Sequence, residues 1–167
     1  MEPKQSIWGI GPRMLLAAAG YALPAGLSSW LWPATCRIRA VPYPVFLTAG
    51  GLLLLAGVPL LIIAGRAATS AYNRDELATT GIFGLVRHPV YSAWIVFLLP
   101  GLVLLSASWP VLPTPLVAYA VFKRKISEEE RYLEWRFGQA YRDYRARVNE
   151  VLPCSPKAWR SLGARRL

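Results

Sequence analysis

The sequence predicts an all-α integral membrane protein with about four transmembrane helices and a cytoplasmic amphipathic helix near the C-terminus. Hydrophobic residues make up 54% of the 167 positions, and they are gathered into long runs, as in membrane proteins. Most of the basic residues, which give a formal net charge of +10, flank these runs. This length is typical of one domain, so we expect a single membrane-embedded unit over residues 1–167.

Four apolar stretches are expected to cross the membrane. The clearest is the second, because its twenty residues carry no charge and are long enough to span a bilayer as a helix. The expected spans cover residues 14–32, 45–64, 89–105 and 109–122. A signal peptide is the alternative for the first stretch, but that run is long, contains Pro24 and lacks a clean small-residue cleavage site. The third and fourth stretches are short, so a tilted helical hairpin stays open.

The basic residues predict which side of the membrane each loop faces. Four spans place both termini and the polar connection 66–88 on one side, together with 17 of the 19 basic residues. Only Arg37 and Arg39 face the other side. The positive-inside bias therefore predicts a multi-pass protein with both termini and this connection in the cytoplasm. A bacterial or archaeal inner membrane is the expected location. Contact with anionic lipid explains the charge more simply than nucleic acid does.

An apolar stripe at helical spacing predicts an amphipathic helix over about residues 126–149, ahead of a basic tail at 153–167. Its members recur every three or four residues: Ile126, Glu130, Leu133, Phe137, Tyr141, Tyr144 and Val148. Glu130 is the exception in this stripe, and a carboxylate on a buried face needs a partner. Glu129 borders the same face, whereas Glu128 points elsewhere.

Two charged clusters are expected to meet at one mouth of the helix bundle. The stretch from Gly81 to Tyr91 contains Arg87 and His88, the only histidine, and leads into the third span. Free N–H groups at that helix start would suit a carboxylate or another acceptor. Glu129 and Glu130 follow the fourth span and could accept hydrogen bonds from an ammonium group or ribose hydroxyls. Taken alone, Arg87 and His88 are explained more simply as anchors at the membrane interface. The glutamates alone are explained more simply as a solvated helix start.

Three short motifs and one tyrosine occur in a characteristic order. They are Arg87-His88-Pro89-Val90-Tyr91, Glu129-Glu130-Arg131-Tyr132-Leu133, Phe137-Gly138-Gln139-Ala140-Tyr141 and Tyr144. Over about residues 75–153 this combination resembles the isoprenylcysteine carboxyl methyltransferase and phospholipid methyltransferase family of membrane-embedded enzymes. The resemblance implies S-adenosyl-L-methionine as the cofactor, held between the loop before the first motif and the post-membrane helix. It implies methyl transfer to a lipophilic acceptor, most like O-methylation of an isoprenylcysteine carboxyl group.

Carried over position by position, the resemblance implies a set of cofactor contacts and a place for the substrate. The cofactor-binding candidates are Leu77, Ala78, Phe83, His88, Pro89, Val90, Tyr91, Glu129 and Glu130. Lys125, with Arg124 beside it, stands where the family often has a substrate-positioning arginine; lysine keeps the charge but loses the planar fork. Ala93 replaces a frequent glycine, and Asn149-Glu150 occupies a region where an arginine is often seen.

The expected chemistry makes small demands on the protein. A sulfonium methyl is already activated, so displacement needs an aligned nucleophile in a dry site and no dedicated base. Arg87 is the one candidate for a catalytic role. The expected partner is a lipophilic small molecule or a lipidated substrate that arrives through the membrane lipid. We expect no nucleic acid, because the basic residues mostly flank the apolar spans. We also expect no metal, because Cys36 and Cys154 lack ligand spacing, and no disulfide between them, since the four-span arrangement puts them on opposite sides of the membrane.

Other functions stay open at this stage. N-methylation of a phospholipid amine and S-methylation of a small thiol belong to the same reaction class. A small non-enzymatic membrane carrier or assembly factor is the alternative from a different class. The expected spans contain essentially no ionisable residues, which argues against ion or proton transport.

Overall fold

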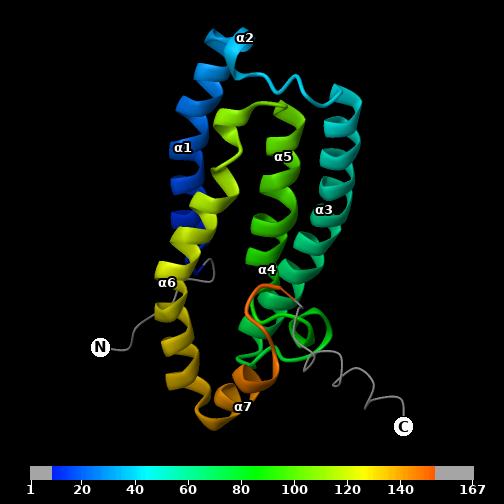
Figure 1. Cartoon of the computed structure of the whole chain (residues 1–167). Coiled ribbons are helices and arrows are strands. Elements are labelled where there is room, and N and C mark those ends of the chain that lie inside the picture. Colours follow the sequence, from blue (N-terminus) through cyan, green and yellow to red (C-terminus); the bar gives the residue numbers. More distant parts are fainter. Residues whose placement is uncertain (1–8, 153–167) are drawn as a thin grey trace.

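A computed structural model describes residues 9–152 as four long helical segments that run alternately up and down (Figure 1). This part of the chain contains no β-strand, only two isolated bridges, so the predicted all-α fold is confirmed. The long segments are α1 (Gly11–Leu31), α3 (Tyr43–Asn73), a third segment formed by α4 (Pro89–Ser92), η2 (Ala93–Leu98) and α5 (Leu99–Ser106), and α6 (Thr114–Phe137). The short elements are α2 (Pro33–Cys36), η1 (Gly81–Gly84), η3 (Trp109–Val111) and α7 (Gln139–Arg147).

Three segments of the described chain, namely α1, α3 and the third segment, are long and apolar enough to cross a membrane. The prediction of a membrane protein is therefore confirmed. The expected fourth span, 109–122, is not among these three segments and does not form a separate helix. Its first residues form the η3 turn, and the rest begins α6, which continues without a break through the charged stretch Lys123–Lys125 to Phe137.

Two further boundaries differ from the sequence expectation. The predicted loop 66–88 is shorter, because α3 continues to Asn73 through a stretch containing three alanines, which are strong helix formers. The predicted single helix over 126–149 is divided at Gly138, whose φ of +54° ends α6 and starts α7 in a new direction. Glycine adopts this backbone conformation without strain. Despite the break, both parts of the apolar stripe remain turned inward, and Tyr141, Tyr144 and Val148 are buried.

Close backbone approach holds α3 against the third segment. A Cβ added to Gly50 would lie 2.8 Å from the carbonyl oxygen of Gly101, and one added to Gly57 would lie 2.7 Å from Cβ of Phe97. Only a residue without a side chain fits at such distances, as at many helix contacts in membranes. On the other side of the bundle α1 packs against α6 through a core that includes Met14, Phe122 and, from the third segment, Tyr91.

The two ends of the bundle differ. At the α2 end, the Ser108 hydroxyl lies 2.6 Å from that of Ser29 and donates to the carbonyl of Cys36, a buried free cysteine. At the opposite end, which we call the α7 end, the chain between α3 and the third segment folds beneath the helices beside α7 (Figure 1). Cys154 and the predicted basic tail lie outside the described residues. All the candidate site residues lie at the α7 end.

Candidate functional site

A cavity of about 1040 Å³ lies at the α7 end, between α1, α3, the third segment, α6 and α7. Its lining contains eight of the nine cofactor-binding candidates predicted from the sequence, together with Arg87. Those eight are Leu77, Ala78, Phe83, His88, Pro89, Val90, Tyr91 and Glu129. Segments that lie far apart in the sequence thus contribute to one concave site, at the upper end of the size range of small-molecule sites.

The extension of α3 shapes one wall of this cavity. Because the helix continues to Asn73, its last turns present Ala68, Thr69 and Tyr72 to the cavity in place of a loop. The chain then turns sharply at Asp75, which has a φ of +58°. The Arg136 guanidinium on α6 pairs with the Asp75 carboxylate, and both residues line the cavity. The sequence analysis missed this pair, since nothing in the spacing of the two residues indicates that they meet.

Glu129 lines the cavity, and a tyrosine holds its carboxylate. The Tyr91 hydroxyl donates a hydrogen bond of 2.8 Å to Oε2 of Glu129 and accepts one of 3.0 Å from the N–H of Ile10. The other carboxylate oxygen, Oε1, lies 3.8 Å from Nδ1 of His88, beyond hydrogen-bond distance. One oxygen of Glu129 is therefore fixed by the protein, and the other has no hydrogen bond within the described part of the chain.

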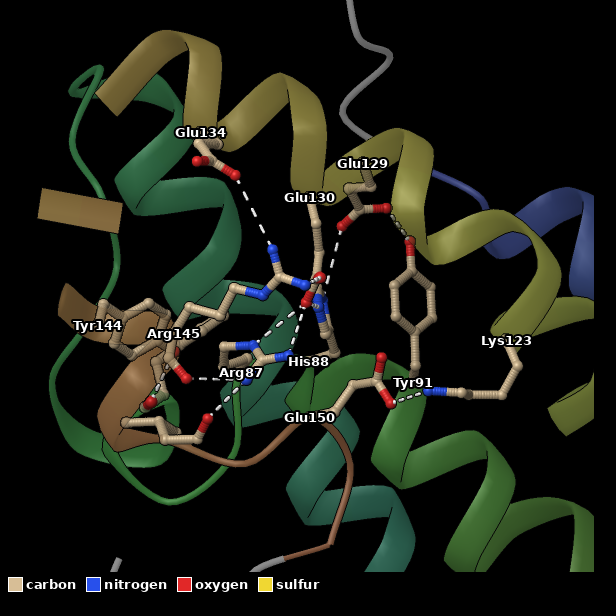
Figure 2. Close-up of polar contacts among 12 residues, drawn as sticks. Arg87, His88, Tyr91, Lys123, Glu129, Glu130, Glu134, Tyr144, Arg145 and Glu150 are labelled. Carbon is tan, nitrogen blue, oxygen red and sulfur yellow. Dashed lines mark hydrogen bonds and ion pairs between the residues drawn. The ribbon is translucent and has the colours of Figure 1, made fainter. Parts of the chain in front are cut away.

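Glu130 lies elsewhere, in a buried ionic cluster (Figure 2). Its Oε1 accepts hydrogen bonds from Nη2 and Nε of Arg87, at 2.7 and 3.2 Å, and lies 3.5 Å from Nε2 of His88. Its Oε2 lies 3.3 Å from Nη2 of Arg145. Burial alone would raise the pKa of Glu130, but the hydrogen bonds from His88 and Arg87 outweigh it and lower the pKa to about 2. Glu130 thus stays ionised and holds the site together rather than lining the cavity.

Arg87 is the centre of this cluster. Besides Glu130, its guanidinium binds two backbone carbonyls near the end of α7, those of Arg145 at 3.2 Å and Val148 at 2.7 Å. It is therefore satisfied by structural partners. The sequence indicates that Glu130 needs a partner but does not identify Arg87 as that partner, and the expectation of a catalytic role for Arg87 gains no support from these contacts.

The segment after α7 is fastened to the start of the third segment through backbone groups. The N–H groups of Arg87 and His88 donate to the carbonyls of Asn149 and Glu150, at 2.7 and 3.0 Å. The Ser92 hydroxyl donates to the carbonyl of Val151 at 2.7 Å. The sequence predicts that N–H groups at this helix start are free to bind a ligand. Those of Arg87 and His88 are not free, because they donate to backbone carbonyls of the chain itself. This fastening depends little on which side chains stand at 149 and 150.

The two substrate-binding candidates are not brought to the cavity. Arg124 is exposed on α6, and Nζ of Lys125 pairs with Oε1 of Glu128 at 2.8 Å on the outer face of the same helix. Neither side chain lines the cavity. Lys125 stands one helical turn before Glu129, near the same face of α6, but its side chain is 43% exposed and turns to Glu128 instead of to the cavity. Within residues 9–152, no group of histidine, cysteine or carboxylate side chains could hold a metal ion.

Two buried tyrosines of α7 line the cavity and differ in their hydrogen bonds. The Tyr144 hydroxyl donates to the carbonyl of Phe83 at 2.7 Å, whereas the Tyr141 hydroxyl has no hydrogen-bond partner among the described residues. Burial raises the pKa of both phenols, so both stay protonated at neutral pH. Tyr141 therefore carries a buried polar group that contributes nothing to the folded state, and Tyr144 ties α7 to the η1 turn.

These tyrosines give a matched pair of substitutions. Tyr144→Phe should lower the free energy of unfolding by about 1 kcal/mol, because a buried hydrogen bond is lost. Tyr141→Phe should leave the free energy of unfolding unchanged or raise it, because the change removes an unpaired buried hydroxyl. Thermal melting of both variants in the same detergent measures the difference. An equal loss at the two positions would show that the Tyr141 hydroxyl is paired in the folded protein.

The arrangement suits a ligand of moderate size with an apolar part and a cationic part. The lining is mostly apolar and aromatic, and it includes Phe83, Leu133 and Phe137. The free oxygen of Glu129 is placed to accept a hydrogen bond from a cationic or hydroxyl group. The lining also includes Leu15 of α1 and Leu61 of α3, which belong to the apolar, membrane-crossing helices, so the cavity reaches from the loops into the bundle.

Comparisons with known proteins agree on one family. The sequence model of the "Isoprenylcysteine carboxyl methyltransferase (ICMT) family" matches residues 55–135. A protein-S-isoprenylcysteine O-methyltransferase of Schizosaccharomyces pombe is 36% identical over 88 residues, which are 52% of this chain and 37% of the relative. The protein of the same name from Rattus norvegicus is 30% identical over 147 residues, 77% of this chain and 50% of the relative. The chain spans about half or less of the length of such relatives. No solved structure matches it.

Proposed function

Because the chain belongs to the isoprenylcysteine carboxyl methyltransferase family, we propose that it is an integral-membrane enzyme that transfers a methyl group from S-adenosyl-L-methionine to a lipophilic acceptor. The acceptor that we favour is the carboxyl group of an isoprenylated cysteine, which is the kind of substrate that the names of the relatives state. The observation that carries the proposal is the cavity. Its walls are mostly apolar and contain the Glu129 carboxylate, one oxygen of which has no hydrogen bond from the described residues.

The residues of the cavity fit the proposed cofactor. Its ammonium group or ribose hydroxyls would find an acceptor in Glu129, whose Oε1 has no hydrogen bond from the described residues. The aromatic rings of Phe83 and Phe137 and the side chain of Leu77 would offer an apolar surface to the adenine base. The buried hydroxyl of Tyr141 is a further group without a partner, among the described residues, at the edge of this cavity. When bound, S-adenosyl-L-methionine supplies a methyl group already activated by its sulfonium charge.

The chain's own groups would then bind, orient and exclude water. A carboxylate acceptor needs no base, so no residue of the cavity has to take up a proton. Glu130 and Arg87 satisfy each other and would keep the loop and α6 in a fixed relation, which alignment of the reacting atoms requires. The lining residues Leu15 and Leu61 support an approach of the acceptor from the level of the membrane-crossing helices.

Binding and transfer test this proposal directly. Purified protein in detergent should bind S-adenosylmethionine and S-adenosylhomocysteine in calorimetry. With labelled cofactor it should methylate an S-prenylated N-acylcysteine, but not the same compound without the prenyl chain. If a phosphatidylethanolamine or a small thiol is labelled instead, the reaction is N-methylation or S-methylation, and the proposed O-methylation is wrong. Absence of any heat and of any thermal shift at millimolar cofactor would rule out all three.

We propose that the α7 end faces the cytoplasm. At the α2 end stand Arg37 and Arg39, while the other 12 basic residues among residues 9–152 belong to segments toward the α7 end. Single cysteines at the exposed positions Arg39 and Arg124, with both native cysteines replaced, should react differently with a membrane-impermeant maleimide. In intact cells we expect labelling at 39 and none at 124 until the membrane is opened. The reverse pattern would show that the orientation is opposite.

A further inference from the structure

The turn at Gly9 and Ile10, directly before α1, reaches the cavity beside the Glu129 carboxylate. Both the turn and its partners belong to the described part of the chain, and Gly9 lines the cavity itself. The Ile10 side chain is buried in the core beside Met14, Tyr91 and Phe122. Its backbone N–H donates a hydrogen bond of 3.0 Å to the Tyr91 hydroxyl, 81 residues along the chain.

This hydrogen bond decides how the Tyr91 hydroxyl is oriented. A phenolic hydroxyl has one proton to donate and can also accept. Because the Ile10 N–H occupies an acceptor position, the proton of the hydroxyl is directed to its other partner, Oε2 of Glu129, at 2.8 Å. The result is a relay of two hydrogen bonds from the backbone of the turn to the carboxylate. Since Glu129 has no other hydrogen bond from the described residues, this relay sets the direction of its second oxygen.

Gly9 is placed where no side chain fits. Its φ is +50°, a conformation that favours glycine. A Cβ added there would lie 2.5 Å from Oε2 of Glu129 and still closer to the Tyr91 hydroxyl. Both atoms belong to groups that a substitution would have to displace. The glycine thus lets the backbone of the turn lie directly against the pair formed by Tyr91 and Glu129.

We propose that the turn formed by Gly9 and Ile10 is a positioning element of the ligand site, which fixes the Glu129 carboxylate through the Tyr91 hydroxyl. The proposal rests on the proposed function in that Glu129 is taken as a contact of the methyl-donating cofactor. The residues that match the family, 55–135, do not include this turn. It therefore adds to the site a group from a part of the chain that the family match leaves unassigned.

The test compares two glycines of the intact protein. Gly9→Ala should weaken binding of S-adenosylhomocysteine about tenfold, which corresponds to about 1.4 kcal/mol. Gly20→Ala in α1 should leave the affinity unchanged, because a Cβ there meets nothing within 4 Å. Calorimetry measures both affinities, and melting temperatures verify that both variants fold. Equal affinities of the two variants would overturn the proposal.

A double substitution separates positioning from general damage. If Gly9 acts through Glu129, then Gly9→Ala in the Glu129→Gln background should weaken binding no further. Losses that simply multiply would mean that the turn acts independently of Glu129, and the proposal would be wrong. Tyr91→Phe provides the same comparison at the middle of the relay.

A measurement without ligand keeps this inference separate from the proposed function. Hydrogen exchange of the Ile10 amide, followed by NMR, should be slow in the wild type and faster in Tyr91→Phe, which lacks the acceptor hydroxyl. If the wild type binds no cofactor but this difference in exchange is seen, the proposed function fails and the positioning of Glu129 stands. If the exchange rates are the same in both proteins, the relay does not exist, whatever the protein binds.

Discussion

Replacing Arg87 by methionine is expected to lower the free energy of unfolding by about 3–5 kcal/mol, because the change leaves a buried carboxylate without its main partner. The side chains of Arg87 and Glu130 are only 11% and 6% exposed, and two hydrogen bonds join them. The same substitution also leaves the carbonyls of Arg145 and Val148 without their donor. Melting temperature and recovery from size-exclusion chromatography in detergent measure the effect.

Two further variants test the cause of this loss. Arg145→Met removes a half-exposed guanidinium from the same carboxylate, so it should cost no more than about 1 kcal/mol. Arg87→Met combined with Glu130→Leu should be more stable than Arg87→Met alone, because the unpaired buried charge is gone. If Arg87→Met melts like Arg145→Met, the buried cluster contributes little to stability, and Arg87 is not the main partner of the Glu130 carboxylate.

The second large effect is expected at the cavity, on binding rather than on stability. Glu129→Gln should weaken the binding of S-adenosylhomocysteine by about 1.5–3 kcal/mol, the usual worth of a hydrogen bond to a charged group. On the order of tenfold or more in affinity would be lost. The melting temperature should change little, because Glu129 has a single hydrogen bond from the described residues, and a glutamine oxygen can accept it.

The neighbouring glutamates are the controls for this substitution. Glu130→Gln should affect stability more than binding. We expect a clear fall in melting temperature, because the buried cluster loses its negative charge. Glu128→Gln should change neither property, since Glu128 is exposed and pairs with Lys125 away from the cavity. Calorimetry and melting curves on the three variants measure both properties. Equal losses of affinity at positions 128, 129 and 130 would mean that general electrostatics, and no specific site, governs binding.

Much of the fold follows from the sequence, because hydropathy and helical spacing are local properties. Charge-free runs indicate where the membrane-crossing helices lie, and the spacing from Ile126 to Val148 predicts the inward stripe member by member. The break in that stripe does not follow from the sequence, because Gly138 is compatible with either a helix interior or a helix end. The continuation of α3 to Asn73 is hidden for a similar reason, since polar residues at a membrane boundary are typical of both loops and helices.

The site could be predicted less completely. The family resemblance identified eight residues that line the cavity, but it did not distinguish the roles of the two glutamates. Glu129 and Glu130 are adjacent, and a difference of about 100° around the helix axis turns one to the cavity and the other to Arg87. The contacts of Arg87 with the end of α7 and of Ile10 with Tyr91 join segments 58 and 81 residues apart. No periodic pattern within one segment can indicate such pairs.

The fastening of residues 149–151 to the start of the third segment also sets an order of events during synthesis. The three membrane-crossing segments leave the ribosome before α7, so they can enter the bilayer while Arg87 and His88 still lack their native partners. A nascent chain arrested before Val148 would therefore be inserted and helical, yet without the backbone carbonyls that complete the turn. Among the described residues, the ligand site is in this sense the last part to be completed, although its arginine and histidine are translated midway.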